Sequence, residues 1–173
     1  MFKNLSIRAK LILLVTLPII VLLFLISKTI YVDKTQLDTL NTLDSIIHLT
    51  KVDSNLVHEL QKERGATAGY LGSKGKKFKN ILLAQRKLTD EKKIEFLHVV
   101  HKLDLEKINK DLAKQIQDSL IQLKKLNQIR QQVDELSVPV KKAIGYYTNL
   151  NSELLDAVNK VIKYQLLLIL QNR

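Results

Sequence analysis

The apolar residues of this chain form one uninterrupted run near the N-terminus and afterwards recur at helical spacing. The run covers residues 11–27 and contains no charged side chain. In a helix it extends over roughly 25 Å, which is near the lower limit for crossing a bilayer. Residues 29–32 extend it. The pattern therefore predicts a transmembrane helix over residues 11–32.

The charges around this run predict its orientation. Three basic residues and no acidic residue precede it, namely Lys3, Arg8 and Lys10. Basic residues next to a span stay in the cytoplasm. A signal peptide is the competing interpretation, but the residues after the run, SKTIYVDK, contain no small-residue cleavage pair. We therefore predict an uncleaved single-pass anchor in a bacterial inner membrane, with residues 1–10 cytoplasmic and everything after about residue 32 periplasmic.

Beyond the anchor, apolar residues fall three and four apart, which is the spacing of one face of a helix. Five glycines and two prolines leave few break points, so the helices should be long. We predict an all-α fold in which the transmembrane helix continues into an antiparallel extracytoplasmic four-helix bundle of residues 33–173. Short joins favour antiparallel neighbours. The expected helices cover residues 9–72, 77–103, 106–136 and 138–171. The first is much the longest and lacks a partner along its lower part, so we expect a homodimer.

One arginine falls on an apolar helical face. The residues that share this face are Val57, Leu60, Arg64, Ala68 and Leu71. No residue three or four positions from Arg64 is acidic, so its own helix offers no ion pair. Small residues run beside it, at 65, 68, 69 and 72. A guanidinium in such a seam needs an anion. Spacing alone favours a carboxylate from another helix, and the alternative is a bound anionic ligand.

Other polar residues on the predicted seams are weaker candidates. Tyr147 and Asn151 lie four apart on the apolar face of the last helix and want hydrogen-bond partners, either in a small buried network or around a ligand. Arg130 lies on the seam of the third helix, although charged seam residues usually extend to solvent. The set Glu95, His98 and His101 is more typical of a solvated face than of a metal site.

Composition narrows the function classes. The net charge is +11, which suits anions or anionic surfaces, while a location outside the cytoplasm argues against nucleic acid. The chain has no cysteine, and no nucleophile–base set, cofactor loop or metal motif is recognisable. The basic turn SKGKKFK lacks the glycine and hydroxyl of a phosphate-binding loop. We therefore expect no enzyme activity and no cofactor.

Three runs in order resemble a known family. They are LVHELQKERGATAGYLGSKGKKF, then LLAQRKLTD, and later YYTNLNSELL at 146–155. Together they resemble the nitrate- and nitrite-sensing (NIT) domain of bacterial transmembrane receptors, over most of residues 35–160. The resemblance implies a helical extracytoplasmic sensor that binds a small anion through arginines, and by motif Arg64 is one of them. The family's second signature, a KE…G.ER run with another arginine, is absent, so we interpret the chain as a truncated receptor.

These observations lead to two hypotheses. The first is a membrane-anchored sensor for nitrate or nitrite that serves signal transduction or chemotaxis, with Arg64, Tyr147 and Asn151 as ligand-binding residues. The second is a structural or interaction bundle without a ligand, in which Arg64 forms an interhelical ion pair. An acidic side chain within reach of Arg64 favours the second hypothesis. An arginine without such a partner, beside a cavity, favours the first.

Overall fold

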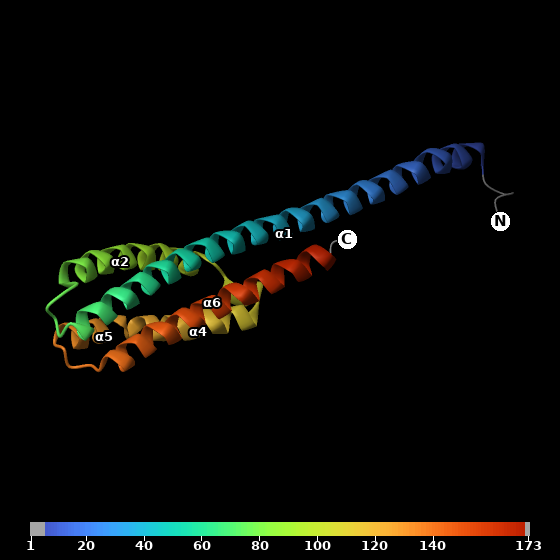
Figure 1. The fold of residues 1–173 in the computed structure, drawn as a ribbon. Coiled ribbons are helices and arrows are strands. Elements are labelled where there is room, and N and C mark those ends of the chain that lie inside the picture. The colour runs from blue at the N-terminus through green and yellow to red at the C-terminus, as the bar shows by residue number, and fades with distance from the viewer. Residues whose placement is uncertain (1–5, 172–173) are drawn as a thin grey trace. The chain divides into compact units, whose positions relative to one another are not determined.

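The structure is a computed structural model that describes residues 6–171, and every regular element in that range is a helix (Figure 1). The chain divides into two compact units, residues 1–42 and residues 43–173. The helices are α1 (Ile7–Gly72), α2 (Lys79–Lys102), α3 (Leu105–Ile108), α4 (Lys110–Lys124), α5 (Leu126–Asp134) and α6 (Val140–Gln171). The all-helical prediction is confirmed.

The first unit contains the N-terminal part of α1. Its apolar side chains are exposed throughout, for example Leu14, Phe24 and Ile30, each more than 60% accessible. Side chains of this kind are stable on a helix surface when lipid replaces water around them. Within residues 6–171, α1 is the helix that is long and apolar enough to cross a membrane, by length and composition.

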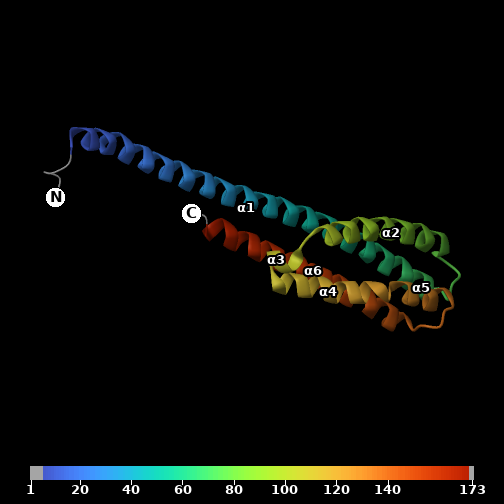
Figure 2. The same ribbon diagram turned by 180° about the vertical axis from the view of Figure 1, so that it is seen from behind.

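The second unit is built around a shared apolar core. Figures 1 and 2 show α2, α4, α5 and α6 running alongside the C-terminal part of α1. Every helix of the unit contributes buried apolar side chains to the larger cluster, among them Leu56, Phe96, Leu105, Ile116, Leu126 and Leu150. A smaller cluster surrounds Tyr70 and Val133 at the end of the unit where α1 turns into α2. Burial of these faces is the dominant stabilising term.

The prediction of one continuous helix over residues 106–136 is wrong, because the chain breaks at two residues. Asn109 has an extended backbone (φ −164, ψ 121), and its side chain accepts a hydrogen bond from the Leu112 amide at 2.9 Å. Asparagine competes with the helix in this way and so starts α4 anew. At Lys125 the amide bonds back to the Gln122 carbonyl, three residues earlier, which tightens the end of α4 before α5 begins.

The turn from α1 to α2 explains part of the small-residue stripe. Gly75 adopts a left-handed conformation (φ +77), and its amide donates to the Tyr70 carbonyl at 2.9 Å, which caps α1. Phe78 then places its ring over Gly69. A Cβ added at Gly69 would lie 2.8 Å from Phe78 Cδ2, so any larger residue there would require the Phe78 ring to move. At Gly65 and Gly72 an added Cβ meets no atom within 4 Å.

Candidate functional site

A buried carboxylate on α1 is the centre of a polar network inside the second unit. Glu63 is fully buried and receives three hydrogen bonds of 2.8 Å. Arg130 of α5 donates two of them, from Nε to Oε1 and from the second terminal nitrogen to Oε2. Tyr147 of α6 donates the third from its hydroxyl to Oε1. This bidentate arrangement satisfies the carboxylate without water.

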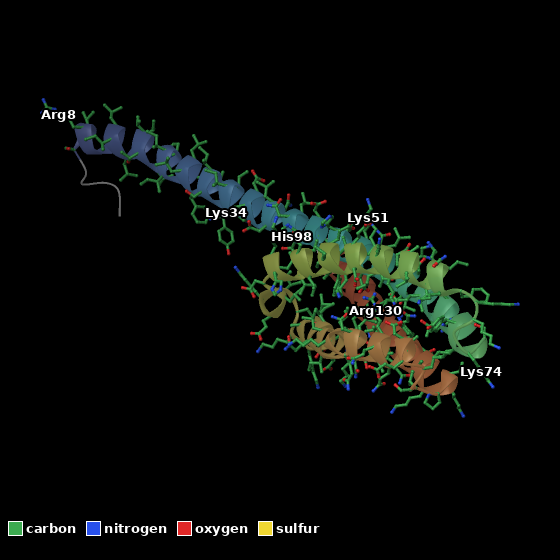
Figure 3. All side chains as sticks on the ribbon, turned by 90° about the vertical axis from the view of Figure 1, so that its left-hand side faces the viewer. Arg8, Lys34, Lys51, Lys74, His98 and Arg130 are labelled. Carbon is green, nitrogen blue, oxygen red and sulfur yellow. The ribbon has the colours of Figure 1, made fainter. Side chains whose placement is uncertain are left out.

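A second arginine joins the network from α2. Arg86 Nε lies 3.9 Å from Glu63 Oε1, and its terminal nitrogen donates to both oxygens of Asp134 at 2.8 and 2.9 Å. Arg130 also donates to Asp90 at 2.8 Å. Figure 3 labels Arg130 between the packed helices. Both buried arginines are therefore neutralised by carboxylates of this chain, which the cost of burying charge requires.

The ionisation of this network is set by burial and by the opposing charges. Burial lowers the pKa of Arg130, but the hydrogen bonds and charge of Glu63, and then of Asp90, outweigh burial and raise that pKa above its usual range. Burial raises the pKa of Tyr147, and the Glu63 charge raises it further. The Tyr147 hydroxyl therefore keeps its proton and stays a hydrogen-bond donor.

Arg64 lies beside this network, on the outer edge of the seam between α1 and α6. Its side chain is half-buried, and its terminal nitrogen donates to the Thr148 hydroxyl at 3.1 Å. Within residues 6–171 no ion pair within 4 Å involves Arg64. It thus differs from Arg86 and Arg130, which are both paired with carboxylates.

The residue on α1 that faces the interior is therefore Glu63 and not Arg64. On the predicted face Val57, Leu60 and Leu71 are buried, whereas Arg64 and Ala68 are only half-buried at its edge. The fully buried positions here are Leu56, Leu60, Glu63 and Thr67. A signal for Glu63 exists, because it follows Leu60 by three and Leu56 by seven residues. This spacing places the Glu63 charge on the buried face but does not show which residue pairs with it.

Two adjacent residues on each helix form two adjacent contacts between α1 and α6. The inner contact joins the Tyr147 hydroxyl to Glu63 at 2.8 Å, and the outer contact joins Arg64 to the Thr148 hydroxyl at 3.1 Å. The Arg64 side chain is partly exposed, so its guanidinium is in contact with solvent.

The other two predicted ligand residues are placed differently. Tyr147 is fully buried and its hydroxyl is used by Glu63, as in the buried-network alternative. Asn151 is also buried, 4% accessible, and its amide atoms have no hydrogen-bond partner within the part of the chain that the structure describes. Arg64 alone of the three is accessible to a ligand.

The predicted preference against a metal at Glu95, His98 and His101 stays a prediction. Glu95 is exposed and pairs with Lys92 at 2.8 Å, one helical turn away. Across the described residues 6–171 no group of three or more potential metal ligands comes together.

Comparison with known families identifies the relatives of this fold. The sequence profile of the nitrate and nitrite sensing (NIT) family matches residues 55–166, which is more than half of the chain and includes the whole polar network. The chain belongs to the NIT family. The resemblance drawn from the LQKERG run and the two later runs is thereby confirmed. No curated protein matches the chain.

One solved structure is similar to this NIT chain. It is the NasR transcription antiterminator, which superposes with a TM-score of 0.71 at 24% sequence identity. The match covers 82% of this chain and 38% of NasR. At this identity the likeness supports the fold alone, and this chain spans well under half the length of that relative.

Proposed function

We propose that this chain is a membrane-anchored NIT sensor that binds nitrate or nitrite at Arg64, outside the cytoplasm, and serves signal transduction. The observation that carries the proposal is the state of Arg64. In the segment that matches the family, it is the arginine without a carboxylate partner among the described residues, and its side chain is partly exposed. A planar guanidinium suits a planar oxyanion, because two parallel N–H groups can meet two oxygens.

The alternative is an interaction module without a ligand. In that case Arg64 would need only its contact with Thr148 at 3.1 Å. The version of this alternative in which Arg64 forms an interhelical ion pair is not supported, since no carboxylate lies within 4 Å of Arg64 in the described chain. In the sensor proposal Thr148 orients the guanidinium through this hydrogen bond, and the buried Tyr147 and Asn151 support the site from the interior.

The remaining parts of the proposal concern placement. Residues 11–32 serve as the single transmembrane anchor, with the N-terminus in the cytoplasm. The helices of residues 33–173 form an antiparallel four-helix bundle on the far side, and two copies associate as a homodimer. Support comes from the basic residues before the apolar run and from the exposed apolar side chains of α1. No nucleic-acid partner is proposed for this chain.

The experiment is anion binding by the full chain in mild detergent. Isothermal titration calorimetry with nitrate, nitrite, chloride and sulfate at matched ionic strength should show binding of nitrate or nitrite only. Nitrate at about a hundred times its dissociation constant should stabilise the domain by roughly 2.7 kcal/mol in a calorimetric melt. Arg64→Ala should abolish binding. Arg64→Lys should weaken it although the charge is kept, because an ammonium lacks the planar fork.

A matched control separates specific binding from general charge. Lys76→Ala removes one positive charge from the exposed turn after α1 and should leave nitrate binding unchanged. Equal responses to all four anions, or equal binding by the wild type and Arg64→Ala, would refute the proposal.

A further inference from the structure

The placement of Arg64 depends on its neighbour. Residues 63 and 64 are consecutive on α1, and residues 147 and 148 are consecutive on α6. A helix holds consecutive side chains at a fixed angle to each other. When the Tyr147 hydroxyl meets Glu63 at 2.8 Å, the same register brings Thr148 to Arg64 at 3.1 Å. The two contacts therefore form or break together.

Apolar packing alone does not set this register so sharply. Leu60 of α1 and Leu150 of α6 belong to one apolar cluster, and the hydrophobic effect that stabilises this cluster is non-directional. A buried hydrogen bond to a carboxylate is directional and is costly to leave unmade. The inner contact is thus the feature that opposes sliding or rotation of α6 against α1 at this level.

Glu63 is itself held from the other side. Arg130 of α5 occupies one position on each carboxylate oxygen, and Arg86 of α2 lies 3.9 Å away. The carboxylate cannot turn toward solvent without losing both hydrogen bonds from the buried Arg130, which would then keep only its pair with Asp90 among the described residues. It therefore presents Oε1 to Tyr147 in a fixed orientation. The position of α6 at this level thus depends on α2 and α5, which hold Glu63, as well as on α1.

We infer that Glu63, oriented by Arg130 and bonded to Tyr147, is a positioning residue that holds Arg64 in its anion-binding orientation on the α1–α6 seam. The inference rests on the proposed function, since it concerns the same arginine. It adds that the acidic residue of the LQKERG run acts through Arg64 and does not contact the anion.

The test compares two tyrosines that are neighbours on α6. Tyr147→Phe removes the hydroxyl that bonds Glu63 but leaves the pair of Glu63 with Arg130 intact. Tyr146→Phe removes a hydroxyl that donates to the Gln122 carbonyl of α4 at 2.9 Å and not to Glu63. Both variants keep their rings, which contact each other edge to face at 5.4 Å between centroids. Each variant therefore loses one tyrosine hydroxyl and one hydrogen bond.

Two readouts are measured on the full chain in detergent, at a temperature where all variants are folded. The first is the dissociation constant for nitrate. The second is the side-chain Nε–H resonance of Arg64 in protein labelled with ¹⁵N-arginine, which is simple because the chain has five arginines. The Arg64 signal is assigned by its loss in Arg64→Lys. Tyr147→Phe should weaken nitrate binding about 5- to 150-fold, the usual range for coupling between sites, and should shift the Arg64 signal. Tyr146→Phe should do neither.

The outcomes separate this inference from the proposed function. If the wild type binds nitrate and the two variants bind it equally well, Glu63 does not position Arg64 and the inference fails, while the sensor proposal stands. If the wild type binds no nitrate but Tyr147→Phe alone shifts the Arg64 signal, the sensor proposal fails and the placement of Arg64 by Glu63 stands. If nitrate does not bind and neither variant shifts the signal, both fail.

Discussion

Asp53 offers the sharpest stability prediction, because it is an acid buried without a partner. Its side chain on α1 is 1% accessible, and neither carboxylate oxygen has a hydrogen-bond partner within residues 6–171. Burial raises its pKa from 3.8 to about 8. Near neutral pH the folded protein therefore keeps Asp53 protonated, whereas the unfolded chain ionises it.

The sign of the pH effect follows from this difference. Below the unfolded pKa of 3.8 the carboxyl is protonated in both states and carries no ionisation penalty. As the pH rises toward about 8, unfolding releases a proton and becomes easier. The largest possible loss is about 1.4 kcal/mol per pH unit, and relaxation around the buried group reduces it. We expect Asp53 to cost the fold roughly 2–4 kcal/mol between about pH 5 and pH 8.

Asp53→Asn removes this cost because asparagine does not ionise. Urea unfolding of the full chain in detergent, followed by circular dichroism, gives the free energy of unfolding of both proteins at several pH values. The difference between Asp53→Asn and wild type should grow in favour of the variant as the pH rises across this window. Asp156→Asn, at an exposed position of α6, is the matched control and should show a constant difference. A constant difference for Asp53→Asn as well would refute the reasoning.

Two further predictions use the same unfolding assay. Gly65→Ala should stabilise the protein by about 0.5–1 kcal/mol, because an added Cβ meets open space and alanine favours the helix. Gly69→Ala should instead destabilise it by about 1 kcal/mol, since the Phe78 ring must move from a Cβ at 2.8 Å, and equal effects of the two changes would contradict this account. Arg130→Lys should cost about 1–3 kcal/mol by losing the bidentate pair with Glu63. Lys92→Ala, which breaks the exposed pair with Glu95, should leave the unfolding midpoint unchanged, and a comparable loss in both would argue against a special role of the buried pair.

Features that depend on residues close together along the chain could be predicted from the sequence. The 3.6-residue spacing of apolar positions predicted that the chain is all helical, and the bounds of α1, α2 and α6 agree with the structure within about two residues. The helix stop near Gly75 follows from glycine's freedom at positive φ. The LQKERG run led to the NIT family without any structure, because that motif is a property of neighbouring residues.

What only the tertiary structure decided is which charges meet. Glu63, Arg86 and Arg130 come from three helices, and their separation along the chain hides the pairing. Consecutive residues of a helix differ by about 100° of rotation, and periodicity places a residue on a face only to within about one position. The sequence therefore indicated Arg64 as the inward charge where the structure has Glu63. Breaks at Asn109 and Lys125, and the Phe78 ring over Gly69, were likewise decided by contacts. Helical periodicity is set by neighbours a few residues apart, whereas burial and ion pairing depend on helices that the sequence separates by tens of residues.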